Sequence, residues 1–313
     1  MRTSGNPTMW AIFAAGVVLM LAIDLGLVGK QDKPVSVREA LARSAVWVAV
    51  AAAFNVGVYA LCGEQAGLEF TAGYLLEEAL SVDNLFVFVV IFSAFRVQSS
   101  YQHRVLFWGI VGAVLLRGFF IGLGTALVQR FWWVMTVFGV LLLYTAWKLF
   151  RGDDDEAEPE RNLAYRLFRR CVPSIAEARG PHFIVRENGK WFATPLLAVL
   201  VLVETSDVLF ALDSIPAVFG VTKDPFIVYT SNIFAILGLR SMYFLLSAVV
   251  QRFVYLKTGL ALILAFVGGK MVAQKWVHVS TGVSLAVIAG VLAVTIAWSL
   301  LWPPKPNEAT ENR

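Results

Sequence analysis

The chain has 313 residues, of which 58% are hydrophobic and 15% are charged, and its mean hydropathy is +0.70. Soluble domains carry about 25% charged residues, so this composition excludes a soluble globular protein. The formal net charge of +4 arises from basic loops and does not indicate nucleic-acid binding.

Nine apolar stretches are long enough for a helix to cross a bilayer core of about 30 Å. A helix satisfies its own backbone groups in lipid, so we expect an all-α polytopic membrane bundle that forms a single domain over 1–313. The first stretch contains Asp24, which favours a retained helix over a cleavable signal peptide. The predicted stretches are 10–29, 44–62, 70–92, 105–125, 131–149, 193–217, 226–248, 257–275 and 280–301.

The basic residues of the loops predict the orientation. Placing the N-terminus outside puts 19 Lys and Arg residues on the inner side and leaves four outside. Cytoplasmic loops carry the excess of Lys and Arg, so the N-terminus is predicted outside and the C-terminus inside. The predicted location is the inner (cytoplasmic) membrane, with membrane lipid as a partner.

One substantial polar loop is expected, at 150–192. Its acidic run over 153–158 is interpreted as a solvated loop, although a metal-collecting patch stays open. The basic stretch over 161–170 is typical of a segment that lies on anionic lipid. The tail 303–313 contains three prolines and is predicted to be disordered.

Seven acidic residues lie inside the apolar stretches, where carboxylates are rare and mark function. Each central charge costs roughly 2.5–3.5 kcal/mol on insertion scales, so these charges are not expected to stand alone. Arg117, Arg240 and Lys270 supply three cations, which leaves a deficit that protons or a bound metal could fill. The seven are Asp24, Glu77, Glu78, Asp83, Glu204, Asp207 and Asp213.

The two densest acidic clusters look like copies of one motif. Each has two acidic residues six positions apart, followed at once by a polar residue, and each acidic stretch precedes a stretch with one arginine, Arg117 or Arg240. The third and sixth stretches would enter the membrane from opposite sides. The sequence therefore predicts inverted three-helix repeats, about 44–125 and 131–248, with the substrate at their interface. The matched residues are Glu77, Asp83 and Asn84 in the first copy and Asp207, Asp213 and Ser214 in the second.

Helical geometry separates the members of each cluster. Asp207 and Ser214 share one stripe, whereas Asp213 falls about 120° away in a regular helix. Asp83 is displaced in the same way in the first copy. Two interpretations stay open: the displaced aspartates face a neighbouring helix, or the helix is interrupted so that both groups converge. Pro216 favours an interruption in the second copy, because its ring removes a backbone hydrogen bond.

The ligand chemistry indicates a hard cation. Carboxylate, amide and hydroxyl oxygens suit Mg²⁺, Ca²⁺ and Mn²⁺, and all three histidines fall in predicted loops, which disfavours zinc or copper. We predict a midplane site with Asp83 and Asp213 as its central pair. Arg117 and Arg240 are interpreted as gating or structural charge partners. The other predicted site members are Glu77, Glu78, Asn84, Glu204, Asp207, Ser214 and Asp24.

Five stretches of the chain resemble the TerC family, in particular its Alx-like members. They are 77–84, 194–197, 204–207, 210–217 and 229–240, and the likeness extends from about Ala22 to Phe266. The resemblance implies an integral membrane protein associated with tellurium resistance and, for Alx-like members, manganese export. It also implies kinship with LysE-type exporters built from inverted repeats.

The expected function is a secondary transporter that exports a divalent cation, with Mn²⁺ favoured by the resemblance. Protons are the expected counter-ion, because site carboxylates would be protonated when the metal leaves. Neither an HExxH pair nor a GxGD motif nor a P-loop occurs, so no enzyme activity and no cofactor are expected. Two alternatives stay open: an exporter of Ca²⁺ or a small amino acid, and a scaffold for the assembly of membrane complexes.

Overall fold

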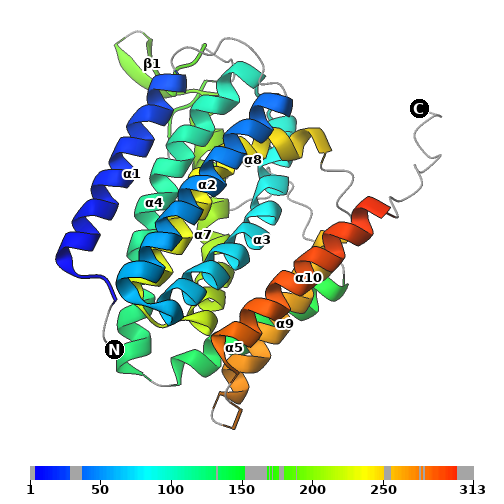
Figure 1. Cartoon of the computed structure of the whole chain (residues 1–313). Helices are drawn as coiled ribbons and strands as arrows, with labels where there is room; N and C mark the ends of the chain where they lie inside the picture. Colours follow the sequence, from blue (N-terminus) through cyan, green and yellow to red (C-terminus); the bar gives the residue numbers. More distant parts are fainter. Residues whose placement is uncertain are drawn as a thin grey trace.

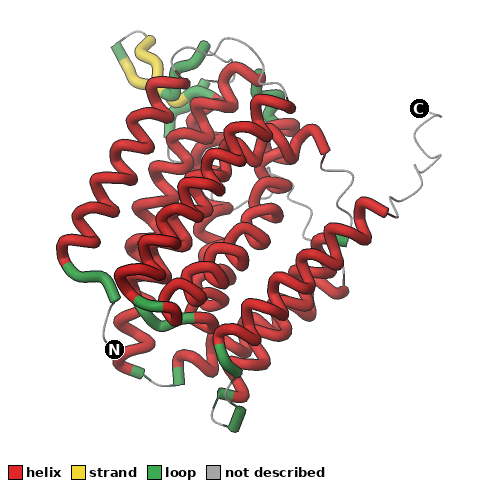
Figure 2. Tube along the Cα trace, viewed as in Figure 1, coloured by secondary structure: helices red, strands yellow, loops and turns green. Residues whose placement is uncertain are grey.

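The computed structural model describes most of the chain as helix (Figure 2). The described residues are 4–28, 37–131, 133–151, 168, 170, 172–175, 180–187, 189–249, 255–274, 276–277 and 279–301. Within them the helices are α1 (Pro7–Val28), α2 (Val37–Cys62), α3 (Glu64–Ala94), α4 (Ser99–Arg130), α5 (Val134–Arg151), α7 (Pro195–Val221), α8 (Pro225–Val249), α9 (Leu256–Ala273) and α10 (Thr281–Leu301).

Each of the nine predicted stretches coincides with one of these helices, so the predicted helical fold is confirmed. Five of the described helical segments are both long and apolar enough to cross a membrane. That all nine cross stays a prediction. The five are Arg38–Cys62, Ser100–Arg130, Val134–Arg151, Pro195–Val221 and Thr281–Ser299.

The helices form one bundle in which α3 and α7 run in opposite directions. In Figure 1, α3 rises from the end where α1 begins, and α7 descends from the end that carries the strands. The two helices contact each other, α8 packs against α3, and α4 packs against α7 and α8.

The bundle presents large apolar side chains to its surroundings. Val56 on α2, Leu115 on α4 and Val294 on α10 are each more than 60% exposed. Charged side chains such as Glu77 and Arg117 are instead fully buried. Apolar groups outside and charges inside suit a protein whose surroundings are lipid.

Two connections follow from local chemistry. Gly63 links α2 to α3 with a φ of 93°, a conformation that glycine adopts without strain. Asp224 precedes α8, and its Oδ1 accepts a hydrogen bond from the Phe226 backbone N–H at 2.9 Å. Pro225 fits the first position of α8 because that position needs no backbone donor. Asp224 Oδ2 also accepts from the Ser4 N–H at 2.6 Å, which ties the start of the chain to this turn.

The expected interruption of the second acidic helix is wrong. α7 continues from Pro195 to Val221 with Pro216 inside it. A proline near the end of a long helix removes one hydrogen bond without ending the helix when surrounding helices hold it in place, and Pro216 is buried among them.

A short hairpin precedes α7, where the sequence predicted no strands. Strands β1 (Ile184–Glu187) and β2 (Lys190–Ala193) pair antiparallel around Gly189, whose φ is 81°. Arg186 stacks over the ring of Trp191 across the pair. The acidic run 153–158, most of the basic stretch 161–170 and the tail 303–313 lie outside the described residues.

Candidate cation site

A fully buried arginine lies at the centre of the bundle. Arg117 on α4 has no exposed surface, and its guanidinium contacts side chains from three other helices. Its Nη2 and Nε donate to the two carboxylate oxygens of Asp207 at 3.0 and 3.4 Å. Its Nη1 donates to Glu77 Oε1, to Ser214 Oγ at 3.2 Å and to Asn232 Oδ1 at 3.2 Å. We call these five residues the Arg117 cluster.

Helical periodicity explains which residues reach the arginine. Asp207 and Ser214 lie seven positions apart on α7, so both point to the same side of that helix, as the sequence predicted. Glu77 comes from α3, which runs antiparallel to α7. The cluster thus joins one carboxylate from each of the two acidic motifs.

The charges within the Arg117 cluster do not balance. Two buried carboxylates surround one guanidinium, which gives a formal charge of −1 when both acids are ionised. The pairing with Asp207 is bidentate, the geometry in which arginine binds carboxylates most strongly. Burial makes loss of either partner costly, because it leaves an uncompensated charge in a low-dielectric interior.

Several buried oxygens around the cluster have no hydrogen-bond partner among the described residues. They belong to side chains within one helical turn of Glu77 or Asp207, or to Glu77 itself. Carboxylate and hydroxyl oxygens of this kind are the ligands that hard cations prefer. These atoms are Glu77 Oε2, Glu78 Oε2, Ser81 Oγ and Glu204 Oε2.

The other two predicted glutamates, Glu78 and Glu204, lie against glycines of neighbouring helices. The carboxylate of Glu204 lies against Gly112 on α4, where a Cβ atom would overlap it. Glu78 Oε1 lies 3.8 Å from the position that a Cβ on Gly238 of α8 would occupy. Neither glutamate forms a described ion pair with Arg117, which pairs with Glu77 and Asp207.

Asp213 lies away from the Arg117 cluster. It is half-buried, and its Oδ1 accepts a hydrogen bond from Thr145 Oγ1 of α5 at 2.9 Å. Because α7 is continuous, six residues turn Asp213 about 120° from the Asp207 stripe, which selects the interpretation that it faces a neighbouring helix. The side chains of Asp83 and Asp24 lie outside the described residues, and Asn84 is buried on α3.

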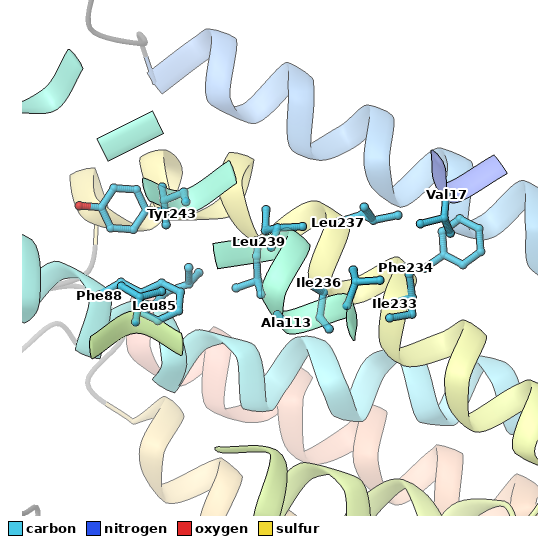
Figure 3. Packing of buried hydrophobic residues seen from close by; sticks show 14 of the residues in the cluster. Val17, Leu85, Phe88, Ala113, Ile233, Phe234, Ile236, Leu237, Leu239 and Tyr243 are labelled. Carbon is cyan, nitrogen blue, oxygen red and sulfur yellow. The ribbon is translucent and has the colours of Figure 1, made fainter. Parts of the chain in front are cut away.

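The Arg117 cluster lies where two apolar cores meet. Ala113 on α4 and Val203 on α7 belong to one core, whereas Ile121 and Ala211, farther along the same helices, belong to the other. Figure 3 shows part of the first core, with labelled side chains from α3, α4 and α8. Apolar packing on both sides isolates the charges from water and strengthens their interactions.

A small cavity adjoins Asp207 on the side of the first core. Its volume of about 10 Å³ leaves room for about one water molecule. Asp207 and Arg240 both line it, together with Phe88, Ala113 and Ile236. The cavity itself is too small for a hydrated ion.

A larger cavity lies at the end of the bundle where α3 begins and α7 ends. It has a volume of about 330 Å³. Glu69 lines it and accepts hydrogen bonds from Thr222 Oγ1 and, at 2.7 Å, from Gln65 Nε2. Lys223 and Lys270 also line it. Glu69 precedes Glu77 by eight residues on α3, a rise of about 12 Å along the helix.

Among the described residues, no three His, Cys, Asp or Glu side chains converge as a ready metal-binding group. The oxygen set at the cluster is instead mixed, with two carboxylates, a hydroxyl and an amide. Asn232 was not selected as a site residue from the sequence, although it is a polar residue in an apolar helix two turns before Arg240. Thr145, the partner of Asp213, was also missed, since threonine in an apolar helix is common.

Comparison with known proteins settles the family. The family model described as "Integral membrane protein TerC family" matches residues 62–307, which covers the Arg117 cluster and all helices from α3 to α10. The chain belongs to the TerC family. It is an integral membrane protein, and the resemblance found in the acidic motifs is confirmed.

Curated TerC relatives match along almost their whole length. "Uncharacterized membrane protein STKORF319" of Myxococcus xanthus is 53% identical over 95% of this chain and 93% of its own. Proteins named "Putative membrane-bound redox modulator Alx" are 43% identical in Photorhabdus laumondii, over all of both chains, and 45% identical in Escherichia coli K12, over 95% and 97%. No solved structure matches the chain.

Proposed function

We propose that this TerC protein is a secondary transporter that exports a divalent metal cation, with Mn²⁺ as the favoured cargo. The observation that carries the proposal is the convergence of Glu77 and Asp207 on one buried cationic group. The two carboxylates come from helices that run in opposite directions, which is the arrangement of a substrate site between inverted repeats.

The donor set suits a cargo that must be released. Glu77, Asp207, Ser214 and Asn232 offer hard oxygens, which favour Mg²⁺, Ca²⁺ or Mn²⁺ over softer metals. Two carboxylates with neutral oxygens give a site of modest charge, and conduction requires binding weak enough for exit. Mn²⁺ is selected among these cations by the family resemblance rather than by the geometry.

Two further assignments complete the proposed pathway. The polar cavity lined by Glu69 serves as its outer mouth, since it lies at the end of α3 that is predicted to face outward. Protons are the counter-ion: a carboxylate of the Glu77 and Asp207 pair takes up a proton when the metal leaves, which keeps the buried charge low during the return step.

Transport into proteoliposomes tests the proposal. Purified protein in vesicles is expected to transport Mn²⁺. Glu77→Gln and Asp207→Asn are each expected to lower the initial rate of Mn²⁺ transport by at least about tenfold, because each removes a buried, charged ligand. Glu64→Gln, an exposed acid at the start of α3, is the matched control and retains the rate. Unchanged Mn²⁺ transport in both site variants contradicts the proposal.

The same vesicles examine the aspartates favoured by the sequence and the rival functions. Asp83→Asn and Asp213→Asn are each expected to abolish metal efflux while leaving membrane insertion intact. A panel of Ca²⁺, Mg²⁺, Zn²⁺ and small amino acids separates the cargo alternatives. A cellular phenotype that persists in Asp207→Asn favours the scaffold alternative, or the redox role after which the Alx relatives are named.

A further inference from the structure

The guanidinium of Arg117 occupies the place where the proposed cargo would bind. It bonds to Glu77, to both oxygens of Asp207, and to the Ser214 and Asn232 side chains. We propose that Arg117 is a tethered competitor of the cargo, which fills the site between transport events and leaves when a divalent cation enters. This inference rests on the proposed function, because it assigns a specificity role within the same site.

The charge of the cluster disfavours simultaneous occupancy by the arginine and a divalent metal ion. With Arg117 in place the two carboxylates leave a formal charge of −1, and a divalent ion added to it produces +1 in a buried site. Replacement of the guanidinium by the divalent ion brings the site to zero. Replacement by a monovalent ion leaves −1 and a displaced arginine, so the competition selects divalent over monovalent cations.

The coordination geometry leads to the same conclusion. Arginine presents its donors in a rigid planar fork, and the Asp207 carboxylate is engaged through both of its oxygens. Nη1 is at the same time shared among three acceptors on α3, α7 and α8. A metal ion needs those oxygens as ligands, so it binds only after the guanidinium has withdrawn.

Glu204 is the acceptor that the displaced guanidinium can reach. It lies on α7 one turn before Asp207, and its carboxylate rests on Gly112 of α4, the helix that carries Arg117. Its Oε2 is buried without a partner among the described residues. Transfer of the Arg117 guanidinium from Asp207 to Glu204 therefore keeps the arginine paired while the metal ion binds in its place at Glu77 and Asp207.

Metal binding to purified variants in detergent tests the inference, with Mn²⁺ as the probe and equilibrium dialysis as the measurement. Arg117→Gln removes the competitor and leaves both carboxylates, so its Mn²⁺ affinity should rise on the order of tenfold or more above wild type. The double variant Glu77→Gln/Arg117→Gln has the same formal site charge of −1 as the wild type but keeps only one carboxylate. It should bind Mn²⁺ more weakly than Arg117→Gln alone. Arg130→Gln, at the exposed end of α4, controls for loss of positive charge.

Transport adds a readout that a merely structural arginine would not produce. Arg117→Gln should bind Mn²⁺ tightly but fail to release it, so its transport rate should fall while its affinity rises. If Arg117→Gln does not fold, Arg117→Lys keeps the charge but loses the fork, and its Mn²⁺ affinity should rise several-fold.

Three results would overturn the inference while leaving the proposed function intact. They are wild-type affinity in Arg117→Gln, wild-type affinity in Arg117→Lys, and tight binding with undiminished transport in Arg117→Gln. An absence of divalent binding to wild type and every variant, with all of them folded, overturns the proposed function itself.

Discussion

At the scale of single residues, this protein buries charges that its apolar helices would otherwise exclude. Glu77 and Arg117 have no exposed surface, and Asp207 has 3%. Charges at this depth persist in membrane proteins when they pair with one another and face the bundle interior. The Arg117 cluster meets both conditions, and its two acids against one base are the basis on which we propose that it binds a cation.

Glycine 112 offers a test of Glu204 that leaves every charge in place. Gly112→Ala would displace the Glu204 carboxylate, since the added Cβ overlaps it, yet the far end of a glutamate can move without unfolding the helix. We expect the rate of Mn²⁺ transport in proteoliposomes to fall on the order of tenfold. The free energy of unfolding should change by less than about 1 kcal/mol.

Gly122→Ala is the matched control for this prediction, because the same helix has open space around Gly122. Equal transport by the Gly112 and Gly122 variants would remove Glu204 from the pathway.

At the scale of elements, α5 and α9 approach each other through glycine. A Cβ on Gly139 would lie 2.9 Å from the backbone oxygen of Gly268, and a Cβ on Gly268 would lie 2.8 Å from that of Gly139. Small residues let transmembrane helices pack by direct backbone contact, which gains dispersion energy where no hydrophobic effect drives association. The pair α5–α9 then supports α7 through the second apolar core.

Two adjacent glycines of α9 are predicted to respond oppositely to the same change. Gly268→Ala forces a methyl group against the α5 backbone and is expected to destabilise the protein by about 1–3 kcal/mol. Gly269→Ala meets open space, so it should be neutral or stabilising by up to about 1 kcal/mol through helix propensity. Thermal unfolding in detergent compares them, and equal shifts in Tm would show that the close approach is unimportant.

At the scale of the whole molecule, the antiparallel course of α3 and α7 gives the two acidic motifs opposite directions within one bundle (Figure 1). The small cavity beside Asp207 and the larger cavity near Glu69 lie toward different ends of these helices. This arrangement fits alternating access, in which the two sides open in turn around a fixed site.

The predicted orientation has a direct test. In a background of Cys62→Ser and Cys171→Ser, Lys223→Cys should react with a membrane-impermeant maleimide in intact cells, because Lys223 is exposed in the turn between α7 and α8. Lys190→Cys, exposed in the hairpin before α7, should react only after the membrane is opened. The reverse pattern would invert the topology and make the proposed transport direction inward.

The sequence by itself determined the helices and the residue types available for chemistry. Apolar length and acidic content need only local information, and the seven-residue spacing of Asp207 and Ser214 correctly predicted their shared face. The periodicity of 3.6 residues per turn also allowed Asp213 to face a neighbouring helix. It faces α5, where Thr145 donates a hydrogen bond to it. The position of Pro216 led to the wrong expectation of a break, because the contacts that hold a helix together around proline come from other helices.

Only the tertiary structure decided which charges meet. Arg117 could pair with several acids by sequence, and the packing of α3, α4 and α7 chose Glu77 and Asp207. Asn232 entered the site for the same reason, since its neighbours are distant in the chain. Residues far apart in sequence share a site only when helix directions and rotations are fixed, and those depend on side-chain packing summed over the whole bundle.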